Sequence, residues 1–140
     1  MKDKFFIDTN VFVYSFDKQN DKKRKKANEL IKTALLNHGG CISSQVIQEF
    51  MNVATKKFDM PMSIPDCEKY LKNVLSPICH VFTSLELYYK SLDVMERWQY
   101  SFYDSLIIAA ALQAECKILY SEDLQHNQKI QYLTIINPFL

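Results

Sequence analysis

The chain has 140 residues, of which 48% are hydrophobic and 24% are charged, and its formal net charge at pH 7 is +1. This composition is ordinary for one globular domain with its own core, and we treat residues 1–140 as a single domain. The near-neutral charge excludes nucleic-acid binding through bulk charge alone, and the two adjacent glycines, Gly39 and Gly40, are too few for a glycine-rich phosphate loop.

The apolar pattern predicts short strands that alternate with helices. Residues 5–7 form a buried strand, and Asp8 can cap a turn of helix after it. A helix is predicted over 21–40, where apolar residues recur at helical spacing until the two glycines end it. Ser44 is expected to cap a helix that runs to about residue 57. The other strands are predicted at 41–43, 80–83, 117–120 and 133–136, and the other helices at about 66–75, 84–97 and 102–115.

This order of elements predicts the fold class. Strands that alternate with helices build a parallel sheet that is covered by helices on both faces. We therefore predict an α/β fold with a central parallel sheet of about five strands. In sheets of this kind the ligand site lies outside the carboxyl ends of the strands.

Four acids occupy positions that have both a structural and a functional interpretation. Asp8 and Asp123 follow two predicted strands, and each can also cap the segment after it. Glu49 falls on the inward stripe of its helix, where a carboxylate is costly unless a partner such as a lysine satisfies it. Asp104 opens a helix that is apolar on nearly every side, and Ser101 gives it the spacing of a capping box.

Taken together, the four acids favour a metal site. Three of them lie near strand ends or helix starts at one end of the predicted sheet, and Glu49 faces inward. Carboxylates that gather in one place raise one another's pKa unless a cation lies between them. Oxygen ligands alone suit Mg²⁺ or Mn²⁺ better than Zn²⁺. Because such ions activate water and stabilise a leaving oxyanion, the pattern indicates a phosphodiester substrate.

The four cysteines and three histidines lack the close spacing of a zinc site. The cysteines lie mostly among apolar residues, which predicts buried, reduced thiols in a cytoplasmic protein. The amino-terminal apolar run is too short for a signal peptide, and no stretch approaches the roughly 20 apolar residues of a membrane span. We therefore expect a cytoplasmic protein without a membrane segment.

Four segments resemble the PIN-domain ribonucleases, in particular the VapC-type toxins of type II toxin–antitoxin systems. They are FFIDTNVFVYSFD, SSQVIQEFMNVA, YSFYDSLIIAAALQAECKILYSEDLQ and the terminal INPFL. The resemblance covers almost the whole chain, and residues 100–125 are its most specific part. It implies a PIN-like α/β/α sandwich, Mg²⁺-dependent endoribonuclease activity toward a structured cellular RNA such as tRNA or rRNA, a homodimer, and a cognate antitoxin that blocks the groove.

The resemblance also implies a role for each of the four acids. The family's acidic quartet corresponds to Asp8, Glu49, Asp104 and Asp123 in this sequence. Asp8 and Asp104 would hold the metal ion most directly. Glu49 and Asp123 would complete the site through water or through a second ion.

Other positions are implied less directly. Asn10 and Ser121 correspond to supporting polar residues, and Glu122 can share or replace the role of its neighbour Asp123. Relatives often have a glycine where this chain has Asn127. Because asparagine tolerates left-handed turn geometry, we expect this difference to leave the chemistry unaffected.

Five basic residues open the helix predicted at 21–40. Cations in a first helical turn oppose the helix dipole, so contact with RNA phosphates would explain them, although a solvated helix end explains them without RNA. The candidates for RNA contact are Lys22, Lys23, Arg24, Lys25 and Lys26.

Other functions compete with this interpretation. A receiver-like, non-catalytic metal-binding module would need a lysine after the last strand, which is followed here by Asn-Pro-Phe, and an Asp-nucleophile phosphatase would need Asp-x-Asp where this chain has Asp8-Thr9-Asn10. A DNA-directed nuclease of the same fold usually carries longer inserts. A silent toxin-like protein that only binds RNA or an antitoxin would not need all four acids.

Overall fold

The computed structural model describes residues 3–37 and 39–140, in which strands and helices alternate. The strands are β1 (Phe5–Ile7), β2 (Gly40–Ser43), β3 (Cys79–Val81), β4 (Ile118–Tyr120), β5 (Lys129–Ile130) and β6 (Leu133–Ile136). The helices are α1 (Thr9–Tyr14), α2 (Asp21–Asn37), α3 (Ser44–Lys56), α4 (Ile64–Tyr70), α5 (Ser76–Ile78), α6 (Leu85–Trp98) and α7 (Phe102–Gln113), with a π-helical turn η1 (Leu71–Leu75) between α4 and α5.

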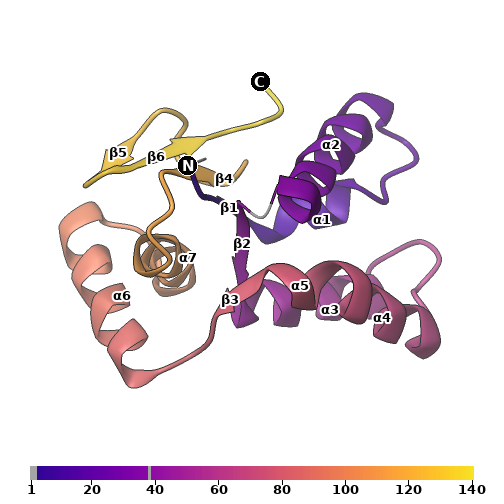
Figure 1. Cartoon of the computed structure of the whole chain (residues 1–140), viewed down its shortest axis with the longest axis horizontal. Coiled ribbons are helices and arrows are strands. Elements are labelled where there is room, and N and C mark those ends of the chain that lie inside the picture. Colours follow the sequence, from indigo (N-terminus) through magenta and orange to yellow (C-terminus); the bar gives the residue numbers. More distant parts are fainter. Residues whose placement is uncertain (1–2, 38) are drawn as a thin grey trace.

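The sheet confirms the predicted α/β fold and its parallel pairing. Its strand order is β3-β2-β1-β4-β6-β5, and every neighbouring pair is parallel except the antiparallel pair β5–β6. Helices α6 and α7 lie on one side of strands β1–β3, and α1–α5 lie on the other (Figure 1). Ile7 at the end of β1 pairs with Tyr120 at the end of β4, so the segments that follow these two strands start side by side.

The most apolar helix, α7, is buried in the core. Every residue of α7 from Ser105 to Leu112 is buried, as expected for a helix without a polar face. On the other face of the sheet (Figure 1), Phe12 of α1 packs edge to face against Phe50 of α3, with ring centroids 6.4 Å apart. This contact holds α1 and α3 together beside the end of β1.

The prediction of about five strands is short by one. β5 is two residues long and pairs only with β6, so it is too short to show an alternating pattern. The segment after Asp123 forms no helix, and this acid therefore caps none. Instead, Asn127 turns the chain with φ 69°, and its N–H donates to the Ile135 carbonyl at 2.7 Å. Asparagine thus adopts the left-handed geometry that it was expected to tolerate.

Several helix boundaries also differ from the prediction: the helix predicted over 21–40 ends at Asn37, with Gly40 already in β2, and the helix predicted over 102–115 ends at Gln113.

Ser44 is the first residue of α3 and Ser43 is its cap, so Ser44 is not the cap. The helix predicted at 66–75 begins earlier, at Ile64, after Ser63 caps it. It then continues through the π-helical turn into α5.

The burial of the thiols confirms the prediction from the sequence. Cys41, Cys67, Cys79 and Cys116 are all buried and free, as predicted. Among residues 3–37 and 39–140, no helix combines the length and apolar character needed to cross a bilayer.

The junction of α2 and β2 leaves no room for a side chain at Gly40. A Cβ built on Gly40 would lie 2.2 Å from the Cβ of Ala34, whereas one built on Gly39 has its nearest neighbour at 3.4 Å. We expect Gly40→Ala to lower the free energy of unfolding by about 1–3 kcal/mol through overpacking, and Gly39→Ala to change it by less than about 0.5 kcal/mol. Urea unfolding followed by circular dichroism measures both, and equal values would contradict the close contact.

Candidate active site

One pocket at the carboxyl ends of the parallel strands is lined by all four acids that the sequence singles out. Asp8 follows β1, Asp123 follows β4, Glu49 lies on α3 and Asp104 lies in the first turn of α7. The parallel pairing of β1 and β4 explains why Asp8 and Asp123 meet. The chain therefore brings together acids that are up to 115 residues apart.

Asp8 is the most constrained of these acids. Its side chain is 7% exposed, and its two oxygens accept hydrogen bonds from the Thr9 N–H and the Ser121 hydroxyl, each at 2.7 Å. Burial is the main reason that the pKa of Asp8 rises to about 6. The two hydrogen bonds lower this pKa, and the charges of Glu49 and Asp123 raise it. Asp8 thus caps α1 and is also a carboxylate that its surroundings disfavour in the ionised form.

The two residues after Asp8 hold two of the other acids. The Thr9 hydroxyl donates to Oε1 of Glu49 at 2.6 Å, and the Asn10 amide donates to Oδ2 of Asp123 at 3.1 Å. In the described part of the chain, no lysine or arginine forms a salt bridge with Glu49. The lysine partner that a purely structural Glu49 would need is therefore not found there.

Asp104 enters the pocket from the start of α7. Its backbone N–H donates to the Ser101 hydroxyl at 3.2 Å, so Ser101 caps the helix as the sequence predicts. Its carboxylate has no hydrogen bond or salt bridge to any residue within 3–37 and 39–140. The capping role explains the start of the helix but leaves this carboxylate available to a ligand.

Glu122 points to a different set of partners from Asp123. Its oxygens accept hydrogen bonds from the Tyr14 hydroxyl and from Nζ of Lys23, both at 2.5 Å. Burial works against ionisation of Glu122, but these hydrogen bonds outweigh it and lower the pKa of the carboxyl. Asp123 lines the pocket and Glu122 does not, which supports Asp123 as the fourth acid.

The polar atoms of the pocket have an excess of acceptors. Oδ1 of Asn10 and Oε1 of Gln45 are buried and lack a hydrogen-bond donor in the described chain. Both residues line the same pocket as the four carboxylates. A buried acceptor oxygen without a donor is unfavourable, and a cation or a donor from outside the protein would offset this cost.

These oxygens suit a hard divalent cation. No three His, Cys, Asp or Glu side chains within the described residues lie close enough together to enclose an ion by themselves. Mg²⁺ usually keeps several waters and binds through only one or two carboxylates, so it does not need such a cage. The donor set therefore fits Mg²⁺ or Mn²⁺ and offers neither thiolate nor imidazole to Zn²⁺.

Gln45 is a site residue that sequence reasoning missed. It is 6% exposed, and its amide donates to Oε2 of Glu49 at 3.4 Å and to the Tyr103 carbonyl at 3.2 Å. It thereby ties Glu49 to the residue that precedes Asp104. The only signal in the sequence is its position four residues before Glu49 on one helical face.

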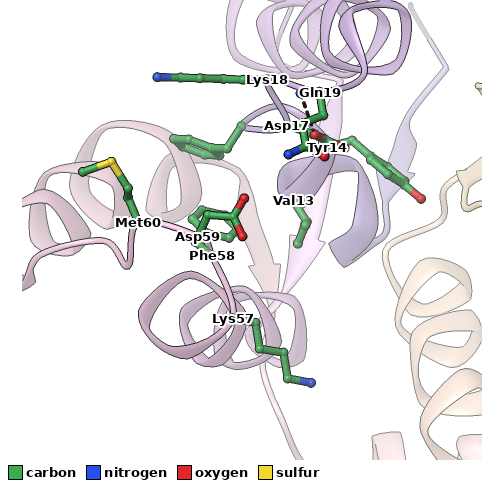
Figure 2. A pocket seen from close by; sticks show the side chains of 10 residues that line it. Val13, Tyr14, Asp17, Lys18, Gln19, Lys57, Phe58, Asp59 and Met60 are labelled. Carbon is green, nitrogen blue, oxygen red and sulfur yellow. Dashed lines mark hydrogen bonds between the residues drawn. The ribbon is translucent and has the colours of Figure 1, made fainter.

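A second pocket adjoins the first one at α1. Val13 and Tyr14 line both pockets, and Phe58 and Met60 line only the second one. Figure 2 shows the hydroxyl of Tyr14 directed away from Phe58 and Met60. None of the four acids lines this second pocket.

The basic run at the start of α2 divides into paired and exposed residues. Lys23 bonds Glu122, and Arg24 forms a salt bridge with Asp21 at 3.0 Å. The exposed members of the run are Lys22, Lys25 and Lys26.

A comparison with protein-family profiles identifies the family of this chain. The profile of the PIN domain family matches residues 5–129. No curated protein sequence matches the chain.

Three solved structures share the fold over most of the chain. A toxin–antitoxin complex from Klebsiella pneumoniae is 18% identical and has a TM-score of 0.68, with 96% of this chain and 98% of that chain covered. VapC20 of Mycobacterium tuberculosis, described as a sarcin–ricin loop cleaving toxin, is 16% identical with a TM-score of 0.63 and coverage of 86% and 90%. VapBC2 of Rickettsia felis, bound to a fragment of its promoter DNA, is 17% identical with a TM-score of 0.61 and coverage of 94% and 96%. At these identities the likeness establishes the fold.

The raised pKa of Asp8 makes stability depend on pH. Between the ordinary value of 3.8 and about 6, the folded chain binds more protons at Asp8 than the unfolded chain does. The free energy of unfolding in EDTA should therefore fall by about 3 kcal/mol as pH rises through this window. We expect Asp8→Asn to remove this part of the pH dependence and to be more stable than the wild type at pH 7.5.

Urea unfolding of both proteins at several pH values between 3.5 and 8 measures the difference. Glu68→Gln is the control, because it neutralises an exposed acid on α4. A wild type and an Asp8→Asn variant with parallel pH curves would contradict the raised pKa.

Proposed function

Because the chain belongs to the PIN-domain family, we propose that it is a Mg²⁺- or Mn²⁺-dependent endoribonuclease, the toxin of a toxin–antitoxin pair. The observation that carries this proposal is one pocket lined by four carboxylates, none of which pairs with a lysine or arginine in the described chain. Such a pocket repels a phosphodiester unless a cation accompanies it. The pocket therefore favours metal-assisted phosphodiester hydrolysis.

In this proposal, Asp8 and Asp104 hold the ion most directly. Asp8 is fixed by its hydrogen bonds with Thr9 and Ser121, and Asp104 has a carboxylate without a described protein partner. When bound, Mg²⁺ or Mn²⁺ stabilises charge on the phosphate and lowers the pKa of water.

Glu49 and Asp123 complete the proposed site. Thr9 orients Glu49, and Asn10 orients Asp123, through the hydrogen bonds described above. Water forms the new P–O bond while one P–O bond of the RNA backbone breaks, and the leaving oxygen takes a proton from solvent, so no side chain has to act as the nucleophile. In this proposal, a carboxylate of the pocket accepts the proton that this water gives up.

The proposed substrate is a structured RNA of the cytoplasm, such as tRNA or rRNA. The exposed lysines at the start of α2 support it, because they can contact phosphates. The similar fold of VapC20, which cleaves the sarcin–ricin loop, also supports RNA as the substrate class. The alternatives are a DNA-directed nuclease of the same fold and a non-catalytic module that binds metal or RNA.

The proposed partners are a cognate antitoxin and a second copy of the chain. Toxin–antitoxin complexes among the similar structures support the antitoxin. An exposed apolar stripe on α6 supports the homodimer, because Leu85, Tyr89 and Leu92 are 74%, 73% and 52% exposed at helical spacing. Analytical ultracentrifugation of the purified chain measures its oligomeric state.

Asp104→Asn tests the proposed activity. We expect the wild type to cut total cellular RNA into discrete fragments with Mg²⁺ and not with EDTA. The variant should cut at least about 100-fold more slowly, because even residues that only support a metal ligand cost 10–100-fold. Gel analysis of the fragments over time measures both rates, and plasmid DNA is incubated in parallel.

The matched control is Asp66→Asn. The N–H of Asp66 bonds the Ser63 hydroxyl at the start of α4 at 3.2 Å, as that of Asp104 bonds Ser101, but Asp66 lies outside the pocket. Equal losses in the two folded variants would contradict a specific role for Asp104. Cleavage of DNA but not of RNA would replace the proposed substrate, and cleavage of neither would favour the non-catalytic alternative.

A further inference from the structure

Three side chains from three segments form a closed network beside the candidate active site. Nζ of Lys23, on α2, donates to Oε2 of Glu122 at 2.5 Å and to the hydroxyl of Tyr14 at 3.3 Å. That hydroxyl, at the end of α1, donates in turn to Oε1 of Glu122 at 2.5 Å. Both carboxylate oxygens of Glu122, in the loop after β4, are therefore occupied.

Two aromatic rings lie beside the ammonium group of this network. Nζ of Lys23 lies 4.3 Å from the ring centroid of Tyr14 and 5.5 Å from that of Phe139, and the two rings meet edge to face at 5.0 Å. The side chains of Lys23 and Glu122 are only 29% and 24% exposed. The two side chains of this pair therefore have less conformational freedom than those of an exposed salt bridge.

The network lies next to the residues that arrange the acids. Glu122 is between Ser121, which donates to Asp8, and Asp123, whose N–H donates to Oγ of Ser121 at 3.3 Å. At the other side, Tyr14 ends the helix that begins with Thr9 and Asn10. The hydrogen bond between Glu122 and Tyr14 thus fixes residues 121–123 relative to α1. The first two residues of this helix, Thr9 and Asn10, bond Glu49 and Asp123.

We propose that Lys23 is a positioning residue of the active site, which acts through Glu122 and Tyr14 to hold Ser121 against Asp8 and Asp123 in the pocket. This inference rests on the proposed metal-dependent nuclease function. It separates Lys23 from its basic neighbours, because its ammonium group already donates to Glu122 and Tyr14 and its charge is balanced by Glu122, whereas Lys25 forms no salt bridge with a described residue.

Three substitutions on α2 test this role. Lys23→Met removes the two hydrogen bonds that the ammonium group donates, Lys23→Arg keeps a cation that can bond Glu122, and Lys25→Met removes one exposed charge from the same helix. Tyr14→Phe keeps the ring and deletes only the hydroxyl. Thermal unfolding establishes that each variant is folded at the assay temperature.

The first measurement is Mn²⁺ binding to the RNA-free protein by isothermal titration calorimetry. We expect Lys23→Met to weaken binding about tenfold, as loss of a group that supports a metal ligand does. Tyr14→Phe should weaken it severalfold, and Lys23→Arg and Lys25→Met should remain within about twofold of the wild type. Equal affinities for Lys23→Met and Lys25→Met would overturn the inference, as would a wild type that binds no Mn²⁺.

The second measurement is the rate of total-RNA cleavage at several salt concentrations. A positioning role predicts that Lys23→Met lowers the rate at saturating RNA without changing its salt dependence. A phosphate contact instead predicts weaker RNA binding and a salt slope smaller by about 1, which would overturn the inference. If the wild type binds Mn²⁺ but cuts no RNA, the nuclease proposal fails while the Mn²⁺ affinities still decide the role of Lys23.

Discussion

The cost of gathering four carboxylates, one of them buried, at one edge of the sheet is the constraint on which the site depends. The parallel strands and α3 and α7 bring four acids to one pocket, and no lysine or arginine in the described chain pairs with them. Hydrogen bonds from Thr9, Asn10 and Ser121 offset part of this cost. The pKa of Asp8 stays raised, mainly because the carboxyl is buried and to a lesser degree because Glu49 and Asp123 are close, so the hydrogen bonds do not fully offset the cost of its charge. A divalent cation is the group that would balance the rest.

Structural and functional roles coincide in the same residues at this site. Asp8 caps α1 and faces the pocket, so the interpretation as a helix cap and the interpretation as a metal ligand are compatible. Ser101 caps the helix of Asp104 in the same way that Ser63 caps the helix of Asp66. Because only Asp104 lies in the pocket, capping accounts for its place in the helix and not for its place beside the other acids.

The sequence predicted the features that follow from local periodicity and from sheet geometry. The alternation of strands and helices predicted the parallel sheet. The positions of Asp8 and Asp123 after two predicted strands predicted that both acids lie at the same edge of this sheet. β5 was missed because two residues held by β6 carry no pattern of their own. Gln45 and Lys23 were not recognised as neighbours of the site, since their contacts depend on packing; Lys23 bonds a residue 99 positions away.

The central claim, that this pocket binds a divalent cation, is tested most directly by the anomalous scattering of manganese. Crystals of the wild type and of Asp104→Asn are soaked in MnCl₂ and measured near the manganese absorption edge. The account predicts an anomalous peak in the acid pocket, in contact with Asp8 and Asp104, that is lost or strongly reduced in the variant. A wild-type map with peaks only outside the pocket, or with none, would contradict it.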